Sequence, residues 1–167
     1  MSLEPRFQSG AIHVPAGEGI QRWVAGDTYS IKAVGQQTKG TLGLVEASVP
    51  PGAGPIAHIH AVGDEAFYIL DGQLEFLDGE RVYTAKTGDF IYVPAGIRHR
   101  FKNKHVHTAR MLFMFTPAGP EEALVEGGDH AIPGVPPPAW DAERFALIDE
   151  VARSLNLSTE LFPETEG

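Results

Sequence analysis

Three histidines and one glutamate stand at fixed spacings in the middle of the chain. They belong to two motifs separated by 15 residues: Gly52-x5-His58-x-His60-x4-Glu65-x6-Gly72 and Gly88-x5-Pro94-x-Gly96-x2-His99-x3-Asn103. Imidazole nitrogens and carboxylate oxygens are common ligands of divalent transition metals. The chain contains no cysteine, so a thiolate ligand is excluded. The four side chains therefore predict a metal site of nitrogen and oxygen donors.

The spacing of these residues suggests how strands could bring them together. His58 and His60 are two positions apart, so on a strand they share a face, with backbones about 6.6–6.8 Å apart. Glu65 has the wrong parity for the same unbroken strand, but a turn at residues 63–64 can return it beside the pair. His99 follows from a strand far along the chain, and closure of a barrel can bring it inside.

The donor set limits the choice of metal without fixing it. It lacks a soft ligand and suits Fe(II), Mn(II), Ni(II), Co(II) or Zn(II) rather than Cu(I). Calcium would require more oxygen ligands. Zinc is often satisfied by four ligands, whereas an octahedral ion would keep two positions open for a substrate and dioxygen. We expect one divalent ion per barrel.

Other titratable residues near the motifs fit a structural role better. Asp64 could compete with Glu65 as a ligand, but Glu65 has the position in the motif and Asp64 is expected to shape the turn. His105 and His107 alternate as His58 and His60 do, yet they lack a companion carboxylate. The remaining histidines are expected at the surface or at a solvated strand end: His13, His105, His107 and His130.

A series of short strands must position the candidate ligands. Alternating apolar and β-branched residues predict strands over 28–34, 41–49, 66–70, 73–77, 81–85, 90–93, 98–102 and 109–116. Asp71-Gly72 and Asp78-Gly79 each lie between two such runs and predict tight hairpins, because this turn requires positive φ. Regular short strands of this kind indicate a barrel or a sandwich.

The character of the chain changes after the last predicted strand. Residues 117–139 are rich in Pro and Gly and predict an extended linker or lid. Asp141 then has the position of a helix N-cap, and apolar residues follow at helical spacing. The expected organisation is a barrel over 1–116, the linker over 117–139, and a helix within 140–167 that packs on the outside of the barrel.

Composition narrows the classes of partner. The net charge is −9, with 22 acidic against 13 basic residues, which argues against a nucleic-acid partner. An apolar run of about 18 residues and a signal peptide are both lacking, so we expect a cytoplasmic protein without a membrane span. Exposed sheet edges favour a homodimer, in which the segment before Thr28 could add a strand to a partner.

All ten positions of the two motifs resemble the barrel motifs of the cupin superfamily, and the likeness covers residues 40–116. The resemblance implies an all-β fold, an antiparallel jelly-roll β-barrel. It also implies a metal ion inside the barrel, held by His58, His60, Glu65 and His99.

Two further stretches, 64–72 and 88–94, are similar to quercetin 2,3-dioxygenase-like cupins with a single barrel. This likeness implies a metal-dependent dioxygenase that cleaves a flavonol or a similar enol or phenol with O2. Glu65 would act as catalytic base as well as ligand. Strand parity with Glu65 and His99 predicts the side chains of an apolar substrate pocket: Phe67, Ile69, Phe101, Met111 and Phe113.

Two other classes of function stay open. A metal-dependent isomerase or a polyketide-type cyclase would use the same ligands without oxygen. A non-enzymatic ligand-binding cupin would bind a small molecule and leave it unchanged. Few charged residues flank the motifs, which disfavours a phosphosugar site.

Overall fold

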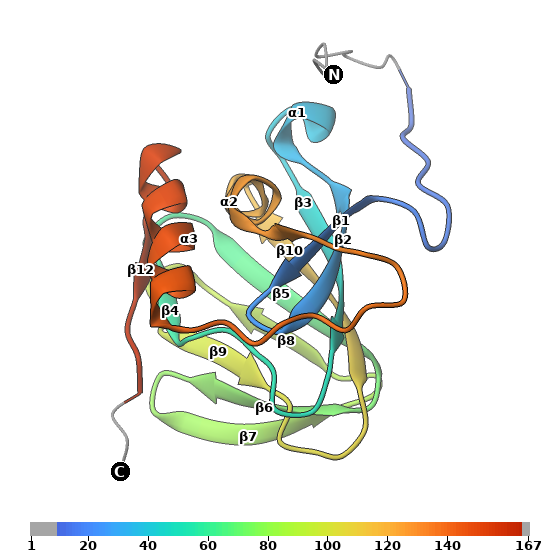
Figure 1. Ribbon diagram of the computed structural model, residues 1–167. Coiled ribbons are helices and arrows are strands. Elements are labelled where there is room, and N and C mark those ends of the chain that lie inside the picture. Colours follow the sequence, from blue (N-terminus) through green and yellow to red (C-terminus); the bar gives the residue numbers. More distant parts are fainter. Residues whose placement is uncertain (1–9, 165–167) are drawn as a thin grey trace.

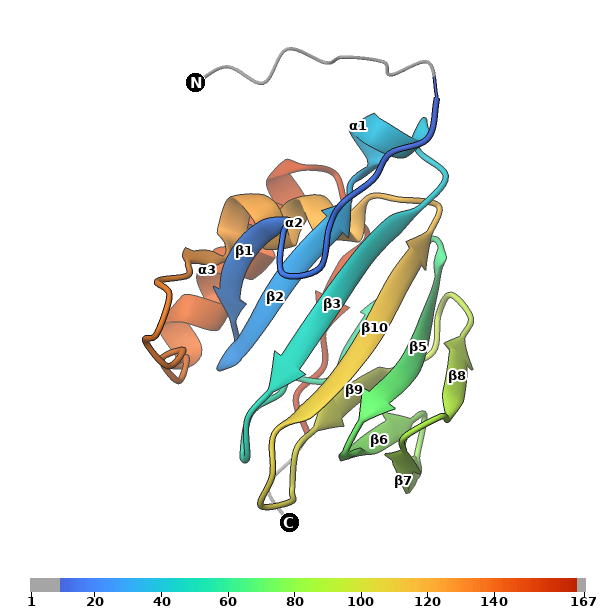
Figure 2. The same ribbon diagram turned by 90° about the vertical axis from the view of Figure 1, so that its right-hand side faces the viewer.

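The computed structural model describes residues 10–164, which form two antiparallel sheets facing each other (Figures 1 and 2). The seven-stranded sheet has the spatial order β11 (Asp129–His130), β1 (Ile20–Val24), β2 (Asp27–Ala33), β3 (Gly43–Val49), β10 (Ala109–Thr116), β5 (Asp64–Asp71) and β8 (Phe90–Val93). The five-stranded sheet has the order β12 (Thr159–Leu161), β4 (His58–His60), β9 (His99–Lys102), β6 (Gln73–Asp78) and β7 (Arg81–Lys86). The predicted all-β jelly-roll barrel is confirmed.

The hydrophobic core lies between the two sheets. Every second residue of β2 and of β3 is buried, as expected for strands with one face turned inward. The inner faces of both sheets contribute large buried side chains: Val45, Val49, Phe67, Ile69, Leu74, Phe76 and Met111. Burial of one such side chain contributes roughly 1.5–3 kcal/mol, so the core holds the strands that carry the site in register.

The two Asp-Gly turns have different roles. β6 and β7 pair with Asp78 opposite Arg81, so the hairpin predicted at Gly79 is confirmed. The hairpin predicted at Gly72 is wrong, because β5 pairs with β10 and β8, and β6 with β7 and β9. Gly72 instead takes the chain from one sheet to the other at φ 82°, where a Cβ would lie 3.1 Å from Ala109 Cα. An Asp-Gly pair indicates positive φ but not which strands pair around it.

Part of the predicted linker forms a helix. Residues 117–139 contain α2 (Pro120–Gly127), so the expectation of an extended segment is wrong over this stretch. Proline is tolerated in the first turn of a helix, where its missing N–H costs nothing. The buried Glu121 accepts hydrogen bonds from the backbone N–H of Gly35 (2.8 Å) and of Gly119 (2.7 Å), which ties α2 to the loop before β3. That loop contains the one-turn helix α1 (Gly35–Thr38).

The C-terminal helix α3 (Ala142–Ser154) begins at the predicted N-cap, where the Asp141 side chain accepts from Arg144 N at 2.9 Å. It lies beside α2 (Figure 1) and contacts β12. The Arg144 guanidinium bonds to Asp129 of β11 and stacks over the Trp140 ring, 4.4 Å from its centroid. These contacts fix α3 to the barrel.

No helix within residues 10–164 is long and apolar enough to cross a membrane.

The N-terminal segment is used within the chain. Residues 20–24 form β1, which pairs with β2 on one side and β11 on the other. The expectation that the segment before Thr28 adds a strand to a partner is therefore wrong for these residues. The ends of the predicted barrel and helix regions, 1–9 and 165–167, lie outside the described residues.

Candidate metal centre and apolar pocket

The four candidate ligands meet inside the barrel. One donor atom from each of His58, His60, Glu65 and His99 lies within 4.8 Å of the others. His58 of β4 and His99 of β9 face each other in the register of the smaller sheet. Glu65 belongs to β5 of the larger sheet and reaches the histidines from the opposite side. The turn after His60 thus carries the chain across the barrel rather than back beside β4.

Hydrogen bonds orient all three imidazoles. His58 and His99 each donate from Nδ1 to the carbonyl oxygen two residues earlier, at 2.8 Å. His60 Nδ1 bonds to the Thr159 hydroxyl at 2.9 Å, so β12 holds this ring. Because Nδ1 is hydrogen-bonded in each ring, Nε2 is the nitrogen that would bind an ion. A hydrogen bond at the other ring nitrogen commonly orients a metal-binding histidine in this way.

The centre is buried, and its charges are coupled. Glu65 Oε2 lies 3.1 Å from His60 Nε2 and 2.8 Å from His99 Nε2. Burial alone would raise the pKa of Glu65, but hydrogen bonds from these two imidazoles outweigh it and hold the pKa below its usual range. Burial and the two neighbouring imidazoles lower the pKa of His58 to about 3. Burial opposes protonation of His99 as well, yet its hydrogen bond to Glu65 raises the pKa overall.

These features fit a divalent ion. An anionic carboxylate and a neutral imidazole are the states in which Glu65 and His58 can act as ligands. Nitrogen and oxygen donors without sulfur suit the first-row divalent metals predicted from the sequence. The His/Glu cluster could therefore hold one metal ion, and its donors do not select among Fe, Mn, Ni, Co and Zn.

We expect metal retention to rise with pH. A proton and a metal ion compete for the same Nε2 atom, so protonation weakens binding. Glu65 and His58 stay available well into acid because their pKa values are lowered, whereas His99, with its raised pKa, takes up a proton first. Dialysis at a series of pH values, followed by elemental analysis, should show loss of metal that begins near or above the ordinary histidine pKa of about 6.5 and grows as the pH falls. Undiminished metal content at pH 4.5 would contradict this competition.

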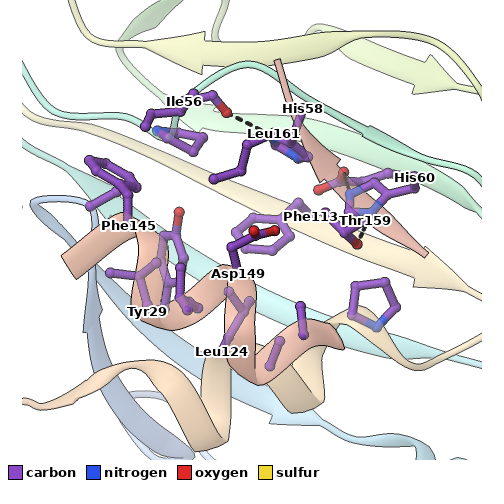
Figure 3. A pocket seen from close by; sticks show the side chains of 18 of the residues that line it. Tyr29, Ile56, His58, His60, Phe113, Leu124, Phe145, Asp149, Thr159 and Leu161 are labelled. Atoms are coloured by element: carbon purple, nitrogen blue, oxygen red, sulfur yellow. Dashed lines mark hydrogen bonds and ion pairs between the residues drawn. The ribbon is translucent and has the colours of Figure 1, made fainter. Parts of the chain in front are cut away.

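An apolar pocket adjoins the cluster (Figure 3). His58, His60 and Glu65 form part of its wall. The rest comes from β1, β2, β9, β10, α2, α3, β12 and loops beside them, and includes Tyr29, Ile56, Phe101, Phe113, Leu124, Trp140, Phe145, Ile148, Asp149, Thr159 and Leu161. A metal cluster in such a wall would meet a largely apolar ligand that carries few polar atoms.

The predicted pocket residues divide into two groups. Phe101 and Phe113 line the pocket. Phe67, Ile69 and Met111 are buried in the core between the sheets and are not in the pocket wall. Phe67 packs edge-on against the His99 ring, with centroids 6.1 Å apart, so it supports the cluster from behind.

Several pocket residues were not predicted from the sequence. The C-terminal helix was expected to pack on the outside of the barrel, and no role in a pocket was predicted for its residues, but Phe145, Ile148 and Ala152 of α3 line the pocket. The helical spacing of these residues predicted an apolar face. What that face covers depends on how α3 docks against its neighbours, which include α2 and β12, and periodicity does not report this docking.

Thr159 offers a test of how β12 supports the cluster. Thr159 lies opposite His60 in the β12–β4 register and bonds to its ring. Thr159→Val keeps the shape and removes the hydroxyl, so we expect metal affinity to fall about 10-fold, at the low end of such effects. Competition with a chelator measures it. Thr84→Val, at an exposed position of β7, is the matched control, and equal affinities for the two variants would contradict the role of Thr159.

Comparisons with known proteins agree with this architecture. Residues 45–115 match the family described as Cupin domain. The chain is 32% identical over 114 residues to the polyketide synthase protein CurC of Streptomyces cyaneus, which covers 68% of this chain and 70% of that protein. It is 29% identical over 147 residues to the quercetin 2,3-dioxygenase of Bacillus subtilis (strain 168), which covers 85% of this chain but only 42% of that enzyme.

Solved structures show the same fold. A predicted oxalate decarboxylase from Thermotoga maritima aligns with a TM-score of 0.60 at 18% identity, covering 64% of this chain and 99% of that one. The chain belongs to the cupin superfamily.

Proposed function

We propose that this cupin is a metal-dependent dioxygenase that acts on a flavonol or a similar enol or phenol. The observation that carries the proposal is the buried cluster of three histidines and one glutamate in the wall of an apolar, aromatic-lined pocket. The similarity to quercetin 2,3-dioxygenase over 85% of the chain supports the same reading. The pocket offers aromatic surface for a planar ligand and a polar end where its hydroxyl would lie.

The residues of the centre have distinct tasks in this proposal. His58, His60, His99 and Glu65 would hold one divalent ion, which supplies Lewis acidity and, if redox-active, electron transfer to dioxygen. Glu65 would also take the proton of the substrate hydroxyl, leaving an electron-rich enolate. Phe101 and Phe113 line the pocket and would exclude water from around the bound substrate.

Oxygen uptake tests the proposal. Protein with its metal content measured is mixed with 3-hydroxyflavone or a more hydroxylated flavonol, while dissolved oxygen and the flavonol's visible absorbance are followed. We expect both to fall together in proportion to bound metal. Metal-loaded protein that leaves every flavonol and the oxygen unchanged would reject the dioxygenase.

A second candidate is a polyketide-type cyclase or a related isomerase that works without oxygen. The similarity to CurC favours this second candidate, because the alignment extends over 70% of that protein. A redox-inert zinc in the purified protein, with conversion of a polycyclic substrate under nitrogen, would support this class. A ligand-binding cupin without catalysis would bind such compounds and return them unchanged.

We also propose that the chain forms a homodimer. β8 is the last strand of the seven-stranded sheet, and its Phe90 and Tyr92 side chains are 63% and 54% exposed. An open edge with exposed aromatic residues favours association with another chain. Sedimentation at micromolar concentration is expected to give twice the monomer mass, and Phe90→Lys to shift it toward the monomer. A wild-type monomer would refute the dimer.

A further inference from the structure

A buried carboxyl group lies close to the pocket without a full set of partners. Asp27, at the start of β2, is 0% exposed. Its Oδ2 is 3.0 Å from the Tyr29 hydroxyl, and its Oδ1 has no hydrogen-bond partner among residues 10–164. An ionised carboxylate buried in this way is costly, so the neutral acid is favoured. Burial raises the pKa of Asp27 well above its usual range, and the bond to Tyr29 only partly opposes this.

Tyr29 connects this acid to the pocket. It is 2% exposed, lies in the pocket wall (Figure 3), and packs edge-on against Phe113 with ring centroids 5.2 Å apart. Asp27 and Tyr29 are two positions apart on β2, so both side chains point to the inner face of the sheet. The hydroxyl thus stands between a buried acid and the cavity that the metal cluster also lines.

The other polar side chains of the pocket wall outside the cluster are already engaged. Thr159 bonds to His60, Trp140 Nε1 donates to Asp129, and Asp149 pairs with Arg153. Tyr29 differs, because Asp27, its one hydrogen-bond partner among residues 10–164, can itself be the donor. A neutral Asp27 that donates from Oδ2 to the Tyr29 oxygen leaves the phenol O–H free to point into the pocket.

We propose that Asp27 and Tyr29 form a recognition pair, in which the Asp27 carboxylic acid donates to the Tyr29 oxygen and Tyr29 donates to an oxygen atom of the ligand. The ligand class is a planar aromatic molecule with two oxygens, a hydroxyl for the metal cluster and a carbonyl or enolate oxygen for Tyr29. The choice of ligand class rests on the proposed function, whereas the pair itself rests on the contacts of β2.

Binding under nitrogen tests the pair without turnover. The probes are 3-hydroxyflavone and 2-hydroxy-1,4-naphthoquinone, titrated by absorbance into metal-loaded protein. We expect Tyr29→Phe to weaken binding of at least one probe about 10-fold, the effect of one lost hydrogen bond. Asp27→Asn should stay within about 2-fold of wild type, because its amide N–H can still donate to the Tyr29 oxygen.

Tyr92→Phe is the matched control. Tyr92, like Tyr29, is hydrogen-bonded to an aspartate, since its hydroxyl donates to Asp64 at 2.5 Å, but this pair lies on the surface. Removal of the Tyr92 hydroxyl should therefore leave probe binding unchanged. Tyr29→Phe takes away the hydrogen bond of Asp27 and can destabilise the fold. The double variant Asp27→Leu/Tyr29→Phe replaces both partners by apolar groups of similar shape and should show the same loss with full metal content.

The outcomes separate this pair from the proposed reaction. Tyr29→Phe and the double variant binding both probes as tightly as wild type would overturn the pair. A loss in Asp27→Asn as large as in Tyr29→Phe would overturn the neutral-acid arrangement. Metal-loaded wild type that binds neither probe would overturn the ligand class. Binding that depends on Tyr29 without oxygen uptake in air would support the pair and reject the dioxygenase.

Discussion

Glu65→Gln is expected to slow flavonol turnover by about 10²–10⁴-fold while leaving the metal-loaded protein able to bind the flavonol. Glutamine keeps the size of the side chain but removes its charge and its capacity to take a proton. Metal affinity should fall as well, by about 10–100-fold if the carboxylate contributes as metal-shell partners commonly do. The assay therefore uses excess metal and follows both flavonol absorbance and oxygen.

Glu80→Gln makes the same change of charge at an exposed position between β6 and β7 and should turn over at the wild-type rate. A Glu65→Gln variant as fast as an active wild type would reject Glu65 as the base. The metal cluster would still stand in that case, because its other donors are independent of proton transfer.

His60→Ala is expected to remove most of the bound metal. The substitution deletes one of four donors and also the imidazole that joins the cluster to Thr159. The loss of affinity should exceed the roughly 10–100-fold effect typical of removing an outer partner. Elemental analysis after gel filtration, with the wild type repleted at neutral pH, measures it.

His107→Ala is the corresponding control, since His107 is exposed and lies outside the cluster. Unchanged metal affinity in His60→Ala would show that the ligands are misassigned. Wild-type protein that holds no metal after repletion would reject the centre altogether.

The spacing of residues along one strand was enough to predict that His58 and His60 lie side by side in the site. His58 and His60 share a face because the side-chain period of a strand is 2. The return of Glu65 to the histidines was also anticipated, but its route was not: β4 and β5 belong to different sheets. The same limit explains Gly72. A short turn has similar residues whether the next strand pairs with the previous one or crosses the barrel.

The pocket shows where such reasoning ends. Strand parity correctly turned Phe67, Ile69 and Met111 toward the interior, where all three are buried. It does not report which interior side chains border a cavity, because that boundary is set by α3 and β12. These elements lie far along the chain, and their docking depends on packing rather than on any local pattern.

The bond between Thr159 and His60 joins residues 99 positions apart in the chain. Through this bond, docking of the C-terminal strand β12 would affect the affinity of the cluster for an ion. Thermodynamic linkage requires the converse: an ion that prefers the oriented ring stabilises the docked segment by the same free energy. Withdrawal of the ion should therefore loosen β12 and α3 together, and amide exchange there would speed up while the barrel core stayed protected. Residues of α3 and β12 also line the pocket. Binding of the ion and closure of the pocket by these two elements should therefore rise and fall together.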